Sequence, residues 1–410
     1  MSSDIVVTGL GATTPLGGDV DSFWEGLIKG RSGVATIEHD WAQSIAVHFA
    51  AEMAQDPAEV LPRVRARRLD RSEQAALVAA QQAWADAGFT ARSDEVGLDP
   101  NRVAVVIGSG IGGVTSLLAQ YDIITAKGPS KVSPLLIPMN MPNGSAAYVG
   151  LAVGARAGVH TPVSACASGA EAVAYGLDLI QLGRADVVVV GGTEACIHPL
   201  TMTGFAQMRA MSTRNDDPAR ASRPFDRHRD GFVLGEGAGV LVMETRAHAQ
   251  ARGARIHATL LAAGVTADSH DIVQPDPQGS GQRRAASIAL QRAGLSPHDV
   301  GHVNAHATST PTGDGPEAKW IAELLGEQTI VTATKSMTGH LLGAAGAIEA
   351  VATVLTVRED TIPPTINLDD IDEAVTVDVP REARSVAVPV ALSNSFGFGG
   401  HNVALLFGKA

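Results

Sequence analysis

Cys166 is the residue whose type and setting best suit covalent chemistry. It lies among small residues in V-S-A-C-A-S-G-A (residues 163–170), after an expected strand and at the start of an expected helix. The dipole at a helix N-terminus lowers the pKa of a thiol, and free backbone N–H groups there can bind an oxyanion. A buried structural cysteine is the alternative, and the more common role of a lone cysteine. Cys196 has no such setting, and we expect it to be structural.

His306 and His340 are the two of 13 histidines that could join Cys166 in a reaction. His306 lies in V-N-A-H-A-T-S-T (residues 303–310), and His340 ends K-S-M-T-G-H (residues 335–340), just before an expected helix. Both are expected at turns after strands, where α/β folds place their sites. A surface or satisfied core histidine is the alternative for each, and an ordinary surface lysine is the alternative for Lys335.

One thiol and two imidazoles suit carbon–carbon condensation better than hydrolysis. A cysteine hydrolase needs one histidine, oriented by an Asp or Asn. In a condensation, an acyl group is held on the thiolate as a thioester. A second thioester loses CO₂ and becomes an enolate, whose oxygen two imidazole N–H groups can stabilise. Lys335 could attract the departing carboxylate or set the field around both imidazoles.

Length and composition predict a large globular protein and exclude several classes. A chain of 410 residues suits two domains or one large duplicated unit. The net charge of −12 argues against a broad nucleic-acid surface, so an acidic partner would need a local basic patch. Two cysteines form no disulfide framework and favour a reducing, cytoplasmic setting. The N-terminal run Ile5–Val7 has no signal-peptide pattern before it, and no apolar run approaches the length of a membrane span.

Short β-branched runs alternate with Ala-rich stretches, which predicts an α/β fold. A helix is expected over Arg71–Ala87, since Asp70 and Glu73 have capping-box spacing and Gly88 follows its end. A second helix with an apolar stripe is expected over Leu341–Arg358. Strands are expected at Ile5–Leu10, Val103–Gly108, Asp186–Gly191, Gly239–Glu244, His302–Ala305 and Val403–Phe407.

The order of these elements repeats, which predicts a duplication. In each half, a small-residue segment leads into a helix, and a Gly-rich turn (residues 235–239 or 397–400) precedes a strand. The junction is expected near residues 250–257, giving an N-terminal half at 1–252 and a C-terminal half at 253–410. The polar, Arg-rich stretch from Met202 to Asp230 is expected to be an ordered excursion from the core.

Several long motifs in one order make the sequence resemble the β-ketoacyl-(acyl carrier protein) synthase I/II family over essentially the whole chain. Besides the three motifs above, the resemblance rests on V-V-T-G-L-G-A-T-T-P-L-G (6–17), S-R-P-F-D (222–226), D-G-F-V-L-G-E-G-A-G (230–239) and N-S-F-G-F-G-G-H-N (394–402). It implies a thiolase-like fold with a duplicated, five-layered α-β-α-β-α architecture. It also implies a homodimer.

The resemblance assigns roles to individual residues. It implies a Cys-His-His site of Cys166, His306 and His340 with Lys335 beside it, and an oxyanion hole from the backbone N–H groups of Cys166 and Phe398. Phe398 would also gate the acyl pocket, with Gly397 and Gly399 allowing the backbone to flex. A plain hairpin turn is the alternative for these glycines. The other residues it singles out are Thr308 and Thr310 for the phosphopantetheine arm, Ile111 for the acyl tunnel, and Glu349, Asn394 and Ser395 for a monovalent cation.

The implied activity is that of a 3-oxoacyl-ACP synthase of fatty acid biosynthesis. It condenses acyl-ACP with malonyl-ACP, releases CO₂ and lengthens the acyl chain by two carbons, with no cofactor. Acyl carrier protein is acidic, so a basic patch is expected to steer it, and a solvated charge run is the alternative. The candidate docking residues are Arg63, Arg65, Arg67, Arg68 and Arg71, extended by Lys131, Arg209 and Arg214.

Two departures and three rival interpretations accompany the resemblance. Ala307 and His401 stand where family members often have Gly and Thr, and the His401 form is similar to actinobacterial members, so the acyl length stays open. The nearest rival is a type II polyketide ketosynthase with a partner subunit. A non-catalytic partner subunit would lack Cys166, and a degradative thiolase would carry a second cysteine in the segment Asn394–Asn402, which has none.

Overall fold

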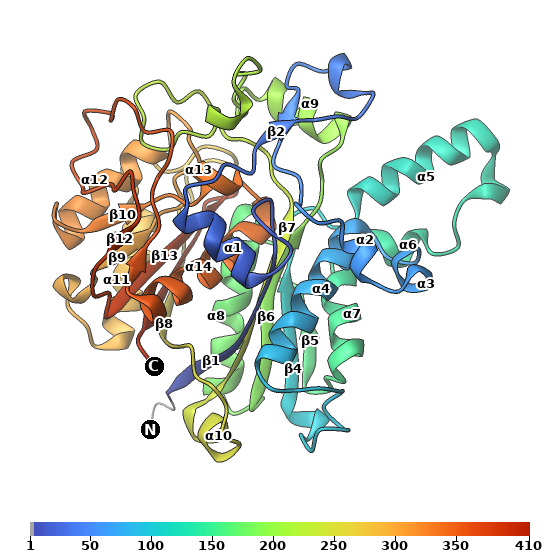
Figure 1. Ribbon diagram of the computed structural model, residues 1–410, viewed down its shortest axis with the longest axis horizontal. Coiled ribbons are helices and arrows are strands. Elements are labelled where there is room, and N and C mark those ends of the chain that lie inside the picture. The colour runs from blue at the N-terminus through green and yellow to red at the C-terminus, as the bar shows by residue number, and fades with distance from the viewer. Residues whose placement is uncertain (1–3) are drawn as a thin grey trace.

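The protein, described here from a computed structural model that covers residues 4–410, is built on a ten-stranded sheet (Figure 1). The hydrogen-bonded order is β10-β9-β13-β14-β8-β1-β7-β6-β4-β5. The strands are β1 (Ile5–Thr13), β4 (Val103–Gly108), β5 (Gly158–His160), β6 (Val187–Glu194), β7 (Gly237–Thr245), β8 (Ala258–Ala267), β9 (His302–Asn304), β10 (Ile330–Thr332), β13 (Val390–Gly397) and β14 (His401–Gly408). Each strand expected from the sequence is present.

The sheet consists of two five-stranded halves with the same topology. In the N-terminal half β1, β7 and β6 are antiparallel neighbours, while β6, β4 and β5 run parallel. In the C-terminal half β8, β14 and β13 repeat the antiparallel part, and β13, β9 and β10 repeat the parallel part. The halves join where β1 pairs antiparallel with β8, at Ile5 and Leu260 among others. Equivalent positions in the two halves can therefore be compared strand by strand.

Helices cover the sheet in layers, which confirms the α/β thiolase-like fold. Helix α4 packs on β1, β7 and β6, and α11 packs on β8 and β14. Helices α8 and α14 contact each other and strands of both halves, so they form the central layer (Figure 1). The main helices are α1 (Val20–Ile28), α4 (Arg71–Asp86), α5 (Val114–Lys127), α7 (Gly144–Val153), α8 (Ser168–Gln181), α9 (Pro199–Gln207), α10 (Arg246–Ala251), α11 (Ser280–Ala293), α12 (Asp314–Leu325) and α14 (Ala345–Glu359).

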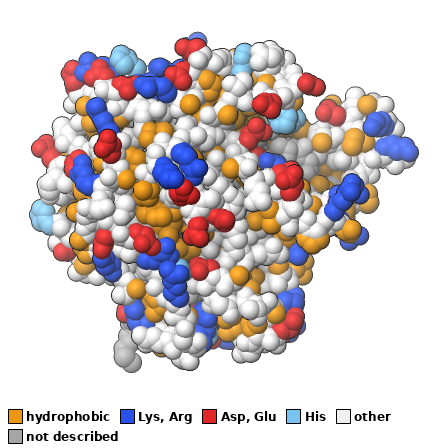
Figure 2. Space-filling model, in the orientation of Figure 1, with side chains coloured by type: hydrophobic (Ala, Val, Ile, Leu, Met, Phe, Trp, Pro, Cys, Tyr) orange, Lys and Arg blue, Asp and Glu red, His pale blue; other side chains and the backbone are white. Residues whose placement is uncertain are grey.

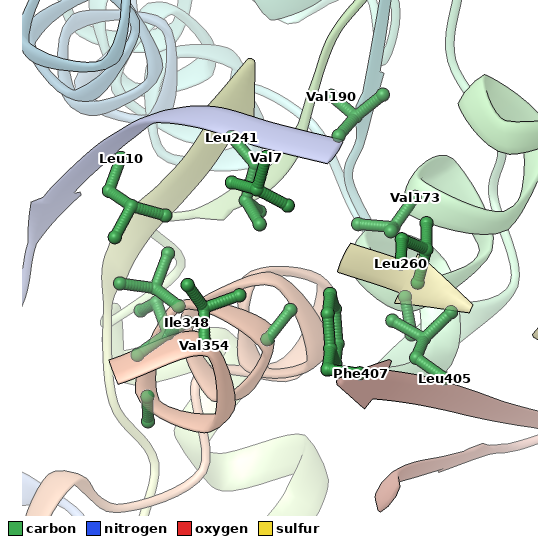
Figure 3. Packing of buried hydrophobic residues seen from close by; sticks show 14 of the residues in the cluster. Val7, Leu10, Val173, Val190, Leu241, Leu260, Ile348, Val354, Leu405 and Phe407 are labelled. Carbon is green, nitrogen blue, oxygen red and sulfur yellow. The ribbon is translucent and has the colours of Figure 1, made fainter. Parts of the chain in front are cut away.

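The central layer holds the largest hydrophobic core, and it corrects the sequence-based view of the last helix. Figure 3 shows Val173 of α8 and Ile348 and Val354 of α14 between side chains of both sheet halves. Helix α14 is buried on every side from Ala345 to Val357, so the predicted stripe was wrong in extent. The expected helix at Leu341 instead begins as a 3₁₀ turn, η7 (Leu342–Ala344), and becomes α-helical at Ala345.

Helix α4 forms as its sequence predicts. Asp70 caps it by accepting the backbone N–H of Ser72, while Glu73 accepts the N–H of Asp70 at 2.8 Å. The helix lies against β1 so closely that a Cβ on Gly11 would meet the carbonyl of Ala79 at 1.9 Å. The glycines of the first motif therefore let a helix pack directly on the strand.

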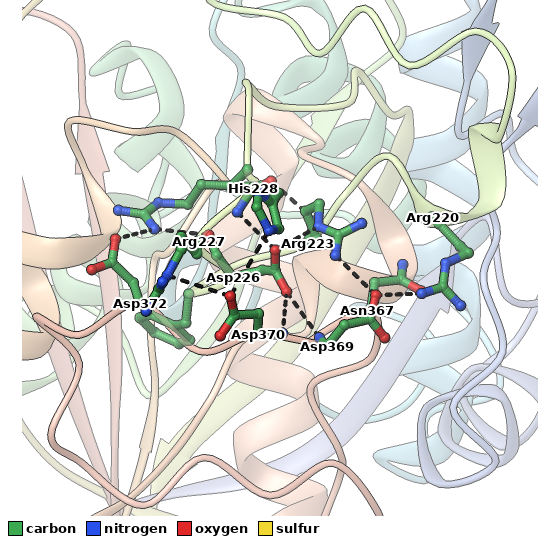
Figure 4. Close-up of polar contacts among 12 residues, drawn as sticks. Arg220, Arg223, Asp226, Arg227, His228, Asn367, Asp369, Asp370 and Asp372 are labelled. Atoms are coloured by element: carbon green, nitrogen blue, oxygen red, sulfur yellow. Dashed lines mark hydrogen bonds and ion pairs between the residues drawn. The ribbon is translucent and has the colours of Figure 1, made fainter.

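The β6–β7 connection is the ordered excursion that the sequence predicts. Its segment Ser222–Asp226 lies against the loop near residues 367–372 of the C-terminal half (Figure 4). Buried Asp226 accepts from Arg223 Nε at 2.9 Å and from the backbone N–H groups of Asp369 and Asp370, each at 2.9 Å. The excursion is thus fastened to the other half by charge-assisted hydrogen bonds.

Two further features bear on function. Helices α5 and α6 (Leu136–Asn140) form an arm that projects from the body beside the short helices α2 (Pro57–Val60) and α3 (Arg63–Ala66) (Figure 1). None of the helices within residues 4–410 combines the length and apolar character needed to cross a bilayer.

Candidate active site

A cavity of about 570 Å³ brings most of the predicted site residues together. It lies where the ends of β4, β9 and β13 meet the turns that begin the two central helices. Cys166, His306 and His340 line it, as do Phe398 and Ile111. The residues are contributed by segments far apart in the sequence, which the duplicated sheet brings to one place.

Cys166 lies in a tight 3₁₀ turn, η4 (Ala165–Ala167), that leads directly into α8. Ala165 has a φ of +50°, a left-handed conformation that is strained for alanine. Ser168 holds the turn by accepting the N–H of Ser164 at 3.0 Å and donating to the Ala165 carbonyl at 2.6 Å. This is the expected elbow, with the thiol 8% exposed at its tip.

The electrostatics of the thiol differ from the sequence-based prediction. Burial raises the pKa of Cys166 to about 12, and the charge of Lys335 opposes this only in part. The helix N-terminus was predicted to lower the pKa of the thiol, but desolvation of the buried thiol outweighs that effect. Hydrogen bonds to the sulfur from the backbone N–H groups of Phe398 and Cys166 also favour the thiolate. Cys196 is fully buried, and burial raises its thiol pKa well above the usual value, in keeping with a structural role.

His306 and His340 face each other across the cavity. Their ring centroids are 5.3 Å apart and the rings are nearly perpendicular, at 87°. Burial lowers the pKa of both imidazoles well below the usual value, and Lys335 lowers them further. Both rings are therefore neutral at physiological pH, the state in which an imidazole offers one N–H donor. His306 follows β9 as expected, whereas His340 follows a short helix, α13 (Lys335–Thr338), rather than a strand.

Lys335 acts on the histidines from within the protein. It is 1% exposed, forms an ion pair with Glu349 at 2.5 Å and lies 3.3 Å from Nδ1 of His306. A proton donated to Nδ1 leaves the imidazole's own proton on Nε2. The geometry thus favours the second predicted role, setting the field around the imidazoles, over attraction of a departing carboxylate.

Glu317 is a site residue that sequence reasoning missed. It lines the cavity from α12, and its two oxygens accept the backbone N–H groups of His306 at 2.8 Å and Ala307 at 2.7 Å. It also accepts from Asn394 at 3.0 Å. Burial raises the pKa of Glu317 to about 7. Its position eleven residues after His306 carries no short-motif signal, and only the loop that turns back to α12 brings the two together.

The turn between β13 and β14 carries Phe398 to the thiol. A Cβ on Gly397 would lie 2.3 Å from the Ser164 carbonyl, so this position needs glycine. Gly399, expected to serve the acyl site, does not line the cavity. It is exposed, and its N–H donates to the Ile272 carbonyl at 2.7 Å.

The residues predicted for the carrier arm and for the acyl channel line the same cavity as the thiol. Thr308 and Thr310 line the cavity with their hydroxyl oxygens 3.1 Å apart. Ile111 lies in the apolar cluster around Cys166 with Phe232 and Leu342. The cavity therefore joins polar side chains, at Thr308 and Thr310, with the apolar cluster that contains Cys166.

The basic residues are more dispersed than the sequence suggests. Arg63, Arg67 and Arg68 are exposed around α3, and Arg65 is half-buried there. Arg209 is exposed at the cavity lining, and Lys131 lies on the projecting arm, whose end carries basic side chains in Figure 2. Arg71 does not belong to a free patch, because it pairs with Glu236 and Asp56. Arg214 donates to the carbonyl of His228.

Comparison with known proteins agrees with this geometry. Residues 2–249 match the model of the Beta-ketoacyl synthase, N-terminal domain, and residues 257–369 match that of the Beta-ketoacyl synthase, C-terminal domain. The chain belongs to the β-ketoacyl synthase family. It is therefore a condensing enzyme of the acyltransferase class.

Curated relatives show which members of the family the chain is similar to along its whole length. This β-ketoacyl synthase is 46% identical to a 3-oxoacyl-[acyl-carrier-protein] synthase 2 of Synechocystis, covering 99% of this chain and 98% of the relative. It is 45% identical to the protein of that name from Mycobacterium tuberculosis, with 99% and 97% covered. It is 43% identical to that from Vibrio harveyi, with 99% and 98% covered.

Solved structures share the fold over the full length of both chains. A β-ketoacyl synthase from Burkholderia phymatum has a TM-score of 0.90 at 35% identity, and covers 100% of each chain. A type II polyketide ketosynthase in complex with its acyl carrier protein has a TM-score of 0.91 at 30% identity, again with 100% covered. The higher identity to the 3-oxoacyl synthases places this enzyme nearer the fatty acid branch.

Proposed function

We propose that this β-ketoacyl synthase is a 3-oxoacyl-ACP synthase that condenses acyl-ACP with malonyl-ACP in fatty acid biosynthesis. The observation that carries the proposal is the convergence of a thiol and two neutral imidazoles on one cavity. The curated relatives support the same activity, since they carry that name along the whole chain. The rival interpretation as a polyketide ketosynthase rests on structures that are only 30% identical.

In the first half-reaction Cys166 takes the acyl group. The thiol loses its proton, its sulfur attacks the acyl-ACP thioester carbonyl, the bond from that carbonyl to the carrier's sulfur breaks, and the phosphopantetheine group takes up the proton and leaves as a thiol. The N–H groups of Cys166 and Phe398, which lower the pKa of the thiol, would hold the oxyanion. The apolar channel beside Ile111 would receive the acyl chain.

In the second half-reaction malonyl-ACP enters and loses CO₂. The electron pair of the broken carbon–carbon bond passes to the thioester carbonyl as an enolate, which His306 and His340 stabilise through their N–H groups. The enolate carbon attacks the acyl-Cys166 carbonyl, and the collapse of that intermediate releases the thiolate. Lys335 and Glu317 act here through His306, by fixing its tautomer and its backbone.

The proposal extends to partners and to an ion. Acyl carrier protein would approach the cavity mouth near Arg209, with Lys131 and the arginines around α3 steering it electrostatically. The enzyme would act as a homodimer, divided internally into halves at 1–252 and 253–410. Glu349, Asn394 and Ser395 each bury a side-chain oxygen without a hydrogen-bond partner within the described residues, and such neutral and anionic oxygens suit a monovalent cation.

Intact-protein mass spectrometry tests the activity. The enzyme and its Cys166→Ala variant are mixed with acyl-ACPs of graded length and then with malonyl-ACP. We expect an acyl adduct on the wild type alone, discharged by malonyl-ACP to a 3-oxoacyl-ACP two carbons longer. The absence of an adduct with every acyl-ACP would contradict the proposal and indicate a partner-dependent or non-catalytic subunit.

A further inference from the structure

Glu194 is a fully buried carboxylate that the mechanism does not use. It is the last residue of β6, 0% exposed, and its oxygens accept four uncharged donors. Oε2 accepts the backbone N–H groups of Gly110 at 2.7 Å and Gly343 at 3.1 Å. Oε1 accepts the N–H of Ile111 and the hydroxyl of Ser109, both at 3.2 Å. Burial raises the pKa of Glu194 to about 7.

These donors belong to two segments that border the proposed acyl channel. Ile111 is part of the loop after β4, and Leu342, next to Gly343, belongs to the turn that starts α14. Both side chains lie in the apolar cluster around Cys166. One carboxylate therefore holds two walls of the channel at a fixed separation.

Gly110 and Gly343 pack too closely against Glu194 to carry a side chain of their own. A Cβ on Gly110 would lie 2.7 Å from Glu194 Oε2, and a Cβ on Gly343 would meet the same oxygen at 2.7 Å and the Gly110 nitrogen at 2.4 Å. Both positions need glycine so that their N–H groups can reach Glu194. The glycine-rich segment that contains Gly110, G-S-G-I-G-G (residues 108–113), therefore forms a loop that binds a carboxylate.

The other half of the molecule uses a carboxylate in the same way. Strand β9 is the counterpart of β4, and Glu317 accepts the backbone N–H groups of the loop that follows it, at His306 and Ala307. Glu317 fixes a loop that carries a site histidine. Glu194 fixes the equivalent loop, which carries the channel residue Ile111 instead.

We propose that Glu194 is a positioning residue that sets the width of the acyl channel and so the enzyme's acceptance of long acyl chains. The inference rests on the proposed acyl channel. A glutamine at this position can keep its oxygen on the N–H groups of Gly110 and Gly343, but its NH₂ group then faces the N–H of Ile111, which loses its acceptor, so the Ile111 loop would move. A short acyl group, which stays near the sulfur, would be affected less than a long one that passes between Ile111 and Leu342.

The test compares acylation rates of Cys166 with hexadecanoyl-ACP and butyryl-ACP in the wild type and in Glu194→Gln. We expect the long-to-short ratio to fall about tenfold. Alkylation of Cys166 by iodoacetamide should not slow, because neutralising Glu194 removes one of the charges that raise the pKa of the thiol. Glu73→Gln is the matched control, because Glu73 is also buried with a pKa that burial raises, to about 8, but it accepts the backbone N–H of Asp70, which lies outside the cavity lining. Its ratio should stay at the wild-type value.

Ser109→Ala removes one donor to Glu194 and the acceptor of the Gly112 N–H but leaves the carboxylate in place, so it keeps the test decisive if the glutamine variant does not fold. We expect it to lower the same ratio by about threefold. An unchanged ratio in these variants, or an equal loss for every acyl length, would overturn the inference alone. A wild-type enzyme that takes no acyl group onto Cys166 would overturn the proposed function with it.

Discussion

The two central helices begin with the same backbone but carry different chemistry. Helix α8 starts after a 3₁₀ turn in which Ala165 has a φ of +50°, and α14 starts after one in which Leu342 has a φ of +45°. The next residue is Cys166 in the first turn and Gly343 in the second. The N–H of Gly343 is occupied by Glu194, whereas that of Cys166 faces its own sulfur. In the first elbow the backbone N–H is available for catalysis, whereas in the second it is bound by a carboxylate.

The connections before and after these elbows differ as well. Only the C-terminal half inserts α13 between its edge strand and its elbow, and this insertion supplies Lys335 and leads to His340. The N-terminal half instead expands the connection between β6 and β7, while its counterpart between β13 and β14 is the short turn that carries Phe398 to the thiol. Duplication supplied the scaffold, and the unequal connections place Cys166 in the N-terminal half and His306, His340 and Phe398 in the C-terminal half.

The largest effect is expected where this division is tested directly. His340→Ala removes one of two donors to the enolate oxygen but leaves the elbow of Cys166 intact. We expect condensation to fall about a thousandfold, while acylation of Cys166 by acyl-ACP stays within about tenfold of the wild type. His39→Ala, which alters a largely exposed histidine, is the control and should change neither rate. Equal losses in both half-reactions would show that the insertion does not serve one step alone.

A somewhat smaller effect is expected where the short turn meets the Cys166 elbow. Gly397→Ala places a methyl group 2.3 Å from the Ser164 carbonyl and 3.2 Å from the Cys166 nitrogen, which would move the Phe398 N–H off the sulfur. We expect kcat/KM for acylation to fall about a hundredfold. Gly204→Ala in α9 is the matched control, since its Cβ would meet nothing within 4 Å. If both variants acylate at the wild-type rate, the turn does not contribute an oxyanion donor.

Local patterns in the sequence were enough to predict the elements, whereas the family resemblance was needed to single out the main site residues. The capping box at Asp70, the repeated order of strands and the small residues around Cys166 each report on backbone geometry within a few positions. The fold class followed from that repeat and from the family resemblance. What depends on distant partners was harder to predict: Glu317 and Glu194 reach their donors only through the closed tertiary structure.

Desolvation was the main physical quantity that the sequence did not reveal. A helix N-terminus can be recognised in a sequence, but the depth at which the sheet halves bury it cannot. The pKa of Cys166 was predicted to fall and instead rises to about 12. The stripe predicted for α14 was wrong for the same reason, because burial by both sheet halves makes every side of the helix a core surface.

The expanded β6–β7 connection should show its contribution in stability. The hydrogen bonds from Arg223 and the Asp369 and Asp370 backbone hold the pKa of buried Asp226 at about 2, below its ordinary value of 3.8. Because the pKa is lowered on folding, the stabilisation is present above about pH 4 and is lost as the pH falls toward 2. Asp226→Asn should lower the free energy of unfolding by about 2 kcal/mol at pH 7 and by about half of that at pH 3.

Chemical denaturation at both pH values checks this expectation. Asp370→Asn is the control, because that side chain is 50% exposed and its ion pairs lie at the surface (Figure 4). Its effect should be below about 1 kcal/mol. A loss in Asp226→Asn that does not depend on pH would mean that the carboxylate's charge is not what fastens the excursion to the C-terminal half.

The last effect, which needs no change to the site itself, concerns the charge state of the Cys166 elbow. Since burial raises the pKa of Cys166 to about 12, its thiolate fraction should grow about tenfold per pH unit between about pH 8 and pH 10. The nearby His306 and His340 stay neutral in this range, and Glu194, Glu317 and Glu349, with pKa values raised to about 7, are already ionised. The alkylation rate with iodoacetamide, measured by mass spectrometry in a Cys196→Ala background, should therefore rise with a slope near one on a logarithmic scale. A plateau below about pH 9 would instead mean that the helix N-terminus and the two N–H donors outweigh desolvation, and that the elbow holds a thiolate before any substrate arrives.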